Sequence, residues 1–379
     1  MNTPVWGLRE PLPRPAPLPG GAEVVIVGGG ITGVSMLVSL RDRGVDAVLV
    51  EREHLAAGAS GRNAGFLLAG VAENYARAVA RYGRNVAAEV WSFTIENHAL
   101  LAAHVDGTDS GYKVRGSLTV ALDIDEASSL EEAATLLAED RLPGVIADIG
   151  EVPGALRSLL NPTDGEIDPV RLVRGLAAAH ADRVYENRVV VAVEDGPNRA
   201  VVRLEGTSID ADAAVLATNA WTDELLAVPI SPVRAQMAAT GPVTRAIYRP
   251  VYADWGNRYW RQRDDGSVLV GGFRHHALAE EVGYDARPSA AVQAHIDSQI
   301  DELVPGATVT HRWAGIMGFS ADGLPLVGLM PGVQRIHVCA GYTGHGMGFA
   351  LKAASTLTGH MLDALPLPAW LDAARSTPA

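Results

Sequence analysis

The chain has 379 residues, 48% of them hydrophobic, and this length and composition predict a globular protein with two domains. Its formal net charge is −13 and no block of basic residues occurs, which argues against nucleic acid as a partner. The single cysteine, Cys339, excludes a disulfide framework and a cysteine metal site, and we expect no bound metal.

The first 21 residues lack a charged leader followed by an apolar core, and their prolines predict an extended arm instead. The longest apolar run, residues 24–40, is interrupted by glycines, so we do not expect it to span a membrane. A reducing compartment suits the lone cysteine. We therefore expect a cytoplasmic protein with no obligatory membrane partner.

Residues 23–51, EVVIVGGGITGVSMLVSLRDRGVDAVLVE, have the pattern of a strand, a glycine turn, a helix and a second strand. We expect the first strand at residues 24–27, the helix from about 31 to 43, and the second strand at 47–50. An acid, Glu51, ends the second strand.

The glycines of this segment each have a physical reason. Gly28 allows the sharp turn, and Gly30 lets a pyrophosphate approach the positive end of the helix dipole. Gly33 lets the helix pack closely on the sheet, and Glu51 stands where a carboxylate accepts hydrogen bonds from a ribose diol. The pattern predicts dinucleotide binding; the alternative is an ordinary buried strand with a Gly-rich turn.

The segment at residues 56–65 is dense in small residues and suits a narrow passage beside a ligand, with a flexible surface loop as the alternative. Asp168 is expected to cap a helix that has Pro169 in its first turn. The other elements expected in the first part of the chain are helices at 73–104 and 125–140, and strands at 112–123, 183–185, 189–194, 200–204 and 214–217, the last entering a turn and helix.

From about residue 228 the chain reads as antiparallel sheet, with Asp264, Asp265 and Gly266 at a hairpin turn. A helix follows at residues 290–306, then short strands at 326–328 and 336–339 and a final helix. No repeat with a period of twenty to fifty residues is seen.

GYTGHGMG, at residues 341–348, repeats the order of strand, glycine turn and helix near the other end of the chain. A second helix N-terminus suits a second partly negative ligand group, such as the N1–C2=O edge of a flavin. The alternative is a tight connection between a strand and a helix, with His345 as an ordinary polar residue.

Five motifs, in order, carry a resemblance: GGGITG with Glu51, GASGRNAGF, VLATNAW, RWAGIMGFSADGLPLVG and GYTGHGMGFA. With these motifs the chain resembles the glycine/D-amino-acid oxidase family of FAD-dependent amine oxidoreductases over nearly its whole length. It is most similar to the gamma-glutamylputrescine oxidase-like and sarcosine oxidase-like members.

The resemblance implies an α/β (α+β) fold: a Rossmann-like FAD-binding domain of the glutathione-reductase type, and a substrate domain with a mixed or antiparallel β-sheet. The FAD-binding domain would be discontinuous, made from residues 1–85, 160–225 and 311–379. The substrate-binding domain would comprise residues 86–159 and 226–310.

The resemblance also implies which residues contact FAD. The first glycine motif and Glu51 would hold the pyrophosphate and the adenosine ribose, the small-residue segment would run along the pyrophosphate and flavin, and the last glycine turn would meet the flavin's pyrimidine edge. The implied contacts are Gly28, Gly30, Ile31, Thr32, Gly33, Glu51, Arg52, Ser60, Arg62, Asn63, Ala64, Gly65, Val189, Ala217, Trp221, Gly315, Gly344, His345, Gly346, Met347 and Gly348.

Two departures from the family pattern concern the covalent attachment of FAD and the binding of the substrate carboxylate. The segment at 315–323 has no cysteine and GASGRNAG has no histidine, so we expect non-covalent FAD. Amino-acid oxidases of this family place an arginine or lysine in the final glycine turn to clamp the substrate carboxylate, where this chain has Gly344 and Gly348. A relocated clamp would come from Arg274, Arg261 or Arg258; the alternative is that these are solvated strand residues.

A third departure concerns the electron acceptor. Sarcosine oxidase-like enzymes use a lysine above the flavin for reaction with dioxygen, but the matching strand SVLVGGFRHH has none. His275, His276 or an arginine could substitute, or another acceptor could take the electrons. Oxidase and dehydrogenase both stay open.

We interpret the chain as an enzyme that oxidises the C–N bond of a small amine or amino acid by hydride transfer to flavin N5, giving an imine that hydrolyses. His345, Arg274 and Tyr259 are the candidate catalytic residues, and Tyr259, Trp260 and Trp255 could desolvate the amine. The alternatives are a D-amino-acid or glycine oxidase proper with a relocated arginine, a flavin-binding protein without turnover and, more remotely, a nicotinamide enzyme.

Overall fold

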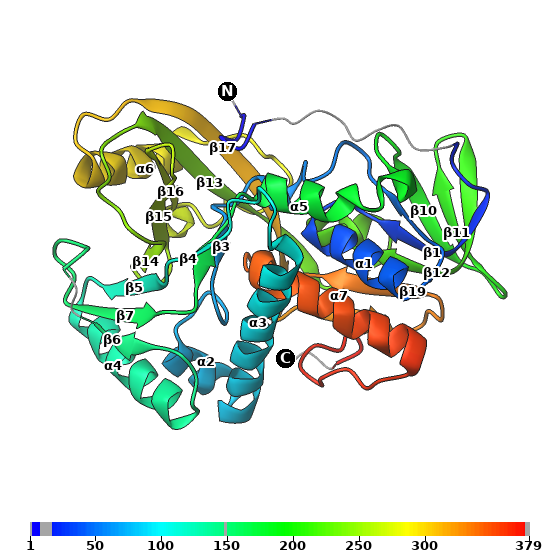
Figure 1. Ribbon diagram of the computed structural model, residues 1–379, viewed down its shortest axis with the longest axis horizontal. Coiled ribbons are helices and arrows are strands. Elements are labelled where there is room, and N and C mark those ends of the chain that lie inside the picture. Colours follow the sequence, from blue (N-terminus) through cyan, green and yellow to red (C-terminus); the bar gives the residue numbers. More distant parts are fainter. Residues whose placement is uncertain (1, 8–16, 148–149, 376–379) are drawn as a thin grey trace.

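The computed structural model describes residues 2–7, 17–147 and 150–375, and it contains two large sheets that stand side by side (Figure 1). Part of the expected N-terminal arm, residues 8–16, lies outside the described residues. The helices that accompany the first sheet and those that accompany the second lie in different parts of the molecule. The fold is therefore mixed α/β, as the sequence predicts.

The first sheet has the strand order β10-β11-β12-β1-β2-β9, and β19 pairs with β12 and β18. Its central strands β9, β2, β1, β12 and β19 run parallel, while β10 and β11 form an antiparallel hairpin at one edge. The bounds are β1 (Gly21–Val27), β2 (Ala47–Val50), β9 (Val184–Tyr185), β10 (Val190–Asp195), β11 (Ala200–Leu204), β12 (Thr207–Leu216), β18 (Leu326–Leu329) and β19 (Ile336–Ala340).

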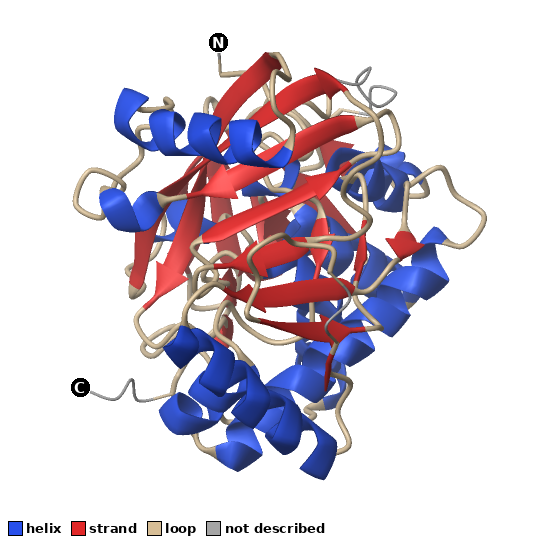
Figure 2. Ribbon diagram, turned by 90° about the vertical axis from the view of Figure 1, so that its left-hand side faces the viewer, coloured by secondary structure: helices blue, strands red, loops and turns tan. Residues whose placement is uncertain are grey.

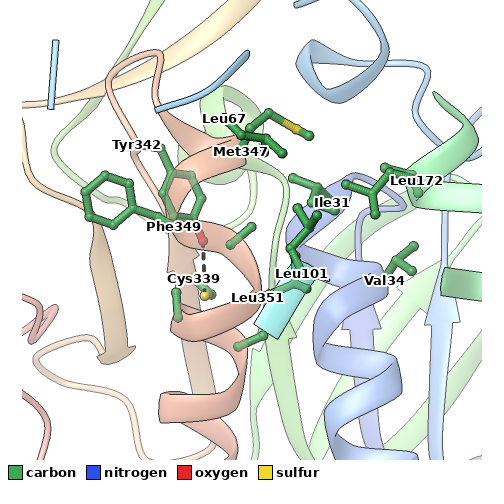
Figure 3. Close-up of a cluster of buried hydrophobic side chains, with 14 of the residues drawn as sticks. Ile31, Val34, Leu67, Leu101, Leu172, Cys339, Tyr342, Met347, Phe349 and Leu351 are labelled. Atoms are coloured by element: carbon green, nitrogen blue, oxygen red, sulfur yellow. Dashed lines mark hydrogen bonds between the residues drawn. The ribbon is translucent and has the colours of Figure 1, made fainter. Parts of the chain in front are cut away.

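Helices α1 (Ile31–Asp42) and α7 (Gly346–Asp363) lie on this sheet, and α3 (Arg84–Val105) and α5 (Pro169–Ala178) pack against them. They pack through apolar side chains such as Ile31, Leu101 and Leu351, which meet between α1, α3 and α7 (Figure 3). The expected cap of α5 is confirmed, since Asp168 accepts hydrogen bonds from the N–H groups of Val170 and Arg171, both at 3.0 Å.

The second sheet is mixed, with the order β17-β13-β16-β15-β14-β5-β7-β6 and one parallel pair, β14 with β5. Figure 2 views the molecule from the side on which this sheet lies in Figure 1. The bounds are β5 (Ser117–Ala121), β6 (Val145–Ile146), β7 (Arg157–Asn161), β13 (Ile230–Pro242), β14 (Val251–Ala253), β15 (Arg258–Gln262), β16 (Ser267–Gly272) and β17 (Val309–Ser320), with helices α2 (Tyr75–Tyr82), α4 (Ile124–Glu139) and α6 (Ala290–Leu303).

A small third sheet, β3 (Phe66–Leu67), β8 (Gly165–Glu166) and β4 (Lys113–Val114), joins segments that are far apart in the chain. The division into two domains stays a proposal. Its expected boundary at residues 310 and 311 falls inside β17, which pairs along its length with β13 of the second sheet. The expected boundary at residue 85 falls near the start of α3, which packs on α7.

Three local expectations were wrong in detail. The strand expected at 112–123 is divided by Gly116 into β4 and β5, because Gly116 has a φ of +70° that turns the chain. The strand at 183–185 is reduced to β9, since residues 181–183 form a 3₁₀ turn. The helix expected after residue 217 is a 3₁₀ helix, Asn219–Glu224.

Among the helices of the described residues, none combines the length and the apolar composition that a membrane crossing needs. The cytoplasmic location stays a prediction.

A buried carboxyl group, Asp164, joins the second sheet to the loop after β3. Ser117 in β5 donates a hydrogen bond to it at 2.6 Å, and the N–H of Ala69 donates another at 3.0 Å. Burial raises the pKa of Asp164 from 3.8 to about 7. Because the folded pKa lies above the unfolded value, stability from this group is present at low pH and is lost as pH rises towards 7.

We expect Asp164→Asn to stabilise the protein at pH 8, by on the order of 3 kcal/mol, and to have little effect below pH 4. Asparagine can keep both contacts of Asp164 without a buried charge, since its oxygen accepts from Ala69 and its amide donates to Ser117. Urea unfolding across this pH range measures the effect. A difference that does not change with pH would contradict the assignment.

Candidate cofactor and substrate site

A cavity of about 730 Å³ lies between the two large sheets. Its lining comes from the β1–α1 turn, the segment after β2, the 3₁₀ helix at Asn219–Glu224, the inner strands of the second sheet and the turn before α7. One elongated cavity thus connects the two glycine motifs, which are about three hundred residues apart in the sequence.

Close backbone packing fixes the nucleotide end of the cavity. Gly28 has a φ of +110°, and a Cβ there would lie 2.7 Å from the carbonyl oxygen of Ala217. A Cβ on Gly33 would lie only 1.8 Å from the carbonyl oxygen of Gly28. Gly30 faces Ser60, whose hydroxyl accepts a hydrogen bond from the N–H of Ile31 at 2.9 Å. The start of α1 therefore faces the cavity without side chains that would exclude a phosphate.

Glu51 is held rigidly at this end. Its carboxylate accepts hydrogen bonds from Gly29 N–H at 2.6 Å and from Glu53 N–H at 2.8 Å. Next to it the Arg52 guanidinium lies 4.4 Å above the ring of Trp221. Burial raises the pKa of Glu51, while the two N–H groups oppose that shift. The carboxylate is thus oriented by the turn that would bind the pyrophosphate.

The small-residue segment runs along the middle of the cavity. Arg62 donates to the carbonyl oxygens of Ala57 at 3.1 Å and Ala314 at 3.0 Å, and the Asn63 amide donates back to Ala59 and Ser60. A Cβ on Gly315 would lie 2.9 Å from the Cβ of Arg62, so β17 approaches this segment closely. The segment is therefore a fixed wall rather than a flexible loop.

The second glycine turn forms the other end. Gly344 has a φ of +90°, and His345 directly precedes α7. The His345 ring lies on the cavity wall, roughly parallel to the ring of Tyr252 at 6.1 Å, and its Nδ1 has no hydrogen-bond partner in the described residues. Desolvation lowers the pKa of His345 to about 4, so the imidazole is neutral at neutral pH.

Two tyrosines and an arginine from the second sheet face this end. The hydroxyl groups of Tyr252 and Tyr259 form no hydrogen bond within the described residues, and burial raises the pKa of Tyr259 to about 12. The Arg274 guanidinium lies 4.9 Å above the ring of Phe319 and likewise has no ion pair or hydrogen bond among the described side chains. These groups are free to bind a ligand.

Other candidates lie away from the cavity. Arg261 is buried and pairs with Glu166 at 3.0 Å, and Arg258 pairs with Asp254 at 3.1 Å. Neither contributes to the cavity wall, and of the three arginines proposed as clamps only Arg274 does. The rings of His275 and His276 lie 3.9 Å apart, tilted by 43°, outside the wall, and Trp260 packs in the core.

The two lysines are also elsewhere. Lys113 pairs with Asp264, and Lys352 pairs with Glu96 at 2.6 Å. Neither lines the cavity, so the cations on its wall are arginines.

Most residues assigned to the cofactor from the sequence do line the cavity; Gly33 and Gly65 lie behind it and act through backbone packing. The lining residues are Gly28, Gly30, Ile31, Thr32, Glu51, Arg52, Ser60, Arg62, Asn63, Ala64, Val189, Ala217, Trp221, Gly315, Gly344, His345, Gly346, Met347 and Gly348. Their individual contacts with FAD stay a proposal.

Several lining residues were missed in the sequence. Tyr252, Phe319 and Met317 come from strands whose inward face cannot be known until the partner sheet is placed. Tyr82, Arg77 and Arg81 lie on α2 near the mouth, in a segment whose helical spacing suggested a purely structural role. For the residues on strands, alternation was the only available signal. It shows which side chains share a face of the strand, but not what that face contacts.

The cavity fits an extended FAD. Its ADP end has a glycine cradle that any Cβ would fill. Its far end has a second helix N-terminus beside the neutral imidazole of His345, whose Nδ1 has no hydrogen-bond partner among the described residues. The fold and this site define a flavin-dinucleotide-binding protein.

Comparison with known proteins gives the family. The profile of the family described as FAD dependent oxidoreductase (DAO) matches residues 23–359. The chain belongs to this family, and it is an FAD-dependent enzyme.

Two curated relatives and one solved structure illustrate the similarity. The chain is 26% identical to the glycine oxidase of Pseudomonas putida, over 91% of this chain and 96% of that one. It is 26% identical to the gamma-glutamylputrescine oxidoreductase of Escherichia coli, over 86% and 80%. The crystal structure of glycine oxidase from Geobacillus kaustophilus superposes with a TM-score of 0.78 at 22% identity, covering 92% and 96%.

Non-covalent attachment of FAD stays a prediction. Cys339 is buried in β19, where its thiol lies 3.3 Å from the hydroxyl of Tyr342 (Figure 3). Thr32 of α1 donates to the same hydroxyl at 3.1 Å. Burial raises the pKa of the Cys339 thiol to about 12, which keeps it a thiol rather than a thiolate nucleophile.

We expect Gly33→Ala to weaken FAD binding at least 100-fold, because its methyl group would overlap the Gly28 carbonyl and force α1 away from the turn. Titration of the apoprotein with FAD, followed by flavin fluorescence, measures the effect. Gly175→Ala in α5 is the control: a Cβ there meets nothing within 4 Å, and FAD affinity should not change. Equal affinities in the two variants would contradict the assigned role of Gly33.

Proposed function

We propose that this enzyme oxidises the C–N bond of a small amine that also carries a carboxylate, that is, an amino acid or an N-substituted amino acid. The observation that carries the proposal is the guanidinium of Arg274 on the cavity wall, which has no ion pair or hydrogen bond among the described residues. The relatives named as glycine oxidases are similar over nearly their whole length, which supports the same class of substrate.

The argument from Arg274 is electrostatic. Desolvation lowers the pKa of this guanidinium, and the carboxylate that acts on it, Glu281, is already paired with Arg234. A substrate carboxylate would supply a partner anion through two parallel hydrogen bonds. The Tyr259 hydroxyl is a further donor on the same wall.

The protonation state of the bound amine follows from the carboxylates that line the cavity. The lining carboxylates are Glu51, Glu53 and Glu224 in the nucleotide part and Glu73, which already pairs with Arg77 and Arg81. None is available to hold an ammonium ion beside Tyr252 and Tyr259. These two rings and the neutral His345 therefore favour the unprotonated amine, which is the form that can be oxidised.

When bound, FAD would supply the oxidant: the α-carbon would give up a hydride to flavin N5 while the amine loses a proton, and the resulting imine would hydrolyse. The protein orients the carboxylate, excludes water with aromatic rings and keeps the amine neutral. The final electron acceptor is dioxygen or another oxidant.

We expect a preference of at least 100-fold in kcat/KM for a carboxylated amine over its counterpart without the acid, for example sarcosine over dimethylamine or alanine over ethylamine. Arg274→Gln should lower kcat/KM for the acid about 100-fold, close to 3 kcal/mol, and leave the simple amine unaffected. Arg258→Gln, on a strand outside the wall, is the matched control and should keep full activity.

Anaerobic bleaching of the flavin absorbance separates the alternatives. Faster bleaching by the simple amine would overturn carboxylate recognition and favour an amine oxidase. An unchanged spectrum with every member of a broad panel would favour a flavin-binding protein without turnover.

A further inference from the structure

Residues 2–7 lie against β17, away from the strand β1 that begins at Gly21 (Figure 1). Asn2 connects three segments there. Its side-chain oxygen accepts a hydrogen bond from Ala314 N–H at 2.9 Å, and its amide donates to the carbonyl oxygen of Ala286 at 2.8 Å. Arg62 donates to the side-chain and main-chain oxygens of Asn2 at 3.3 and 3.4 Å.

Trp6 forms a second attachment. Only 4% of it is exposed, and its indole N–H donates to the carbonyl oxygen of Asn63 at 3.0 Å. The guanidinium groups of Arg261 and Arg263 lie 5.3 and 5.1 Å from its ring. A Cβ on Gly65 would lie 3.3 Å from the indole, so the ring packs directly on the backbone of the small-residue segment.

Within the described residues, the hydrogen-bond acceptors of the Arg62 guanidinium are all neutral groups. Within the described residues the Arg62 guanidinium has no carboxylate at ion-pair distance; its acceptors are three backbone carbonyls and the Asn2 amide oxygen. Neutral acceptors do not cancel the positive charge of Arg62, so this charge acts on the cavity that Arg62 lines. The position of that charge depends on acceptors supplied by residue 2.

We propose that Asn2 and Trp6 are positioning residues for FAD: they hold the segment from Arg62 to Gly65 against β17, and so set the place of the Arg62 charge beside the flavin. Residues that precede the dinucleotide-binding motif in the chain thus support the cofactor site without lining the cavity. The proposal rests on FAD as cofactor and is independent of the substrate proposed above.

The experiment compares single variants of the full-length protein. Asn2→Ala removes the side-chain acceptor. Asn2→Asp keeps an acceptor for Ala314 N–H and adds a negative charge facing Arg62, but it gives up the hydrogen bond to the Ala286 carbonyl. Trp6→Ala removes the packing, whereas Trp6→Phe keeps an aromatic ring but loses the indole N–H and part of the ring area. Trp370→Phe is the matched control, because Trp370 is also a buried tryptophan near a chain end, 6% exposed, with one indole hydrogen bond, to Glu89 at 3.0 Å.

Three quantities are measured on each variant: the melting temperature of the apoprotein, the Kd for FAD from flavin fluorescence, and the reduction potential of the bound flavin. We expect Asn2→Ala and Trp6→Ala to raise the Kd at least 10-fold. Asn2→Asp should bind FAD more tightly than Asn2→Ala. It should also make the potential more negative, because its carboxylate neutralises Arg62 and disfavours the extra electron density of the reduced flavin. Trp370→Phe should lower the melting temperature alone.

Two results would overturn the proposal. One is a Kd for FAD in Asn2→Ala and Trp6→Ala that equals that of Trp370→Phe at a similar loss of melting temperature, which would mean that the residues support the fold alone. The other is an unchanged potential in Asn2→Asp. If an alanine variant does not fold, Asn2→Asp and Trp6→Phe still give the potential and the Kd. Because none of these readouts needs a substrate, failure of the proposed reaction would leave them unaffected.

Discussion

The contact between α1 and the first glycine turn is the constraint on which the site depends. The absent side chain at Gly33 allows the helix to approach the Gly28 carbonyl to a distance that a methyl group would prevent. That approach directs the N-terminus of α1 at the cavity and lets the Gly29 N–H reach the carboxylate of Glu51. A single close packing contact thus orients both the phosphate-binding end and the ribose-binding acid.

The groups that we propose to act on the substrate lie where the two large sheets meet. The first sheet contributes the second glycine turn with His345, and the second contributes Tyr252, Tyr259 and Arg274. One side provides a neutral imidazole and a helix N-terminus. The other provides a guanidinium without an ion pair and two hydroxyls without a hydrogen bond, as far as the described residues show. This division suits a cofactor fixed by one domain and a substrate oriented by the other.

The motifs that bind the cofactor could be predicted from the sequence because their geometry is local: a glycine turn, the helix after it and the acid that ends the next strand. The substrate side is not local. Tyr259 and Arg261 share one face of β15 by alternation, yet Tyr259 meets the cavity while Arg261 is covered by Glu166 and Trp6. Alternation identifies the face, but only the tertiary fold shows what covers it.

The same limit applies to the domain boundaries and to the N-terminal residues. Nothing near residue 311 in the sequence shows that β17 pairs with β13, and nothing near Asn2 shows that it reaches Arg62.

The most direct test of the central claim is a crystal structure with FAD and a non-reactive carboxylate inhibitor. The account predicts that the inhibitor's carboxylate binds Arg274 with the flavin beside His345; a carboxylate bound elsewhere in the cavity, with Arg274 unoccupied, would contradict it.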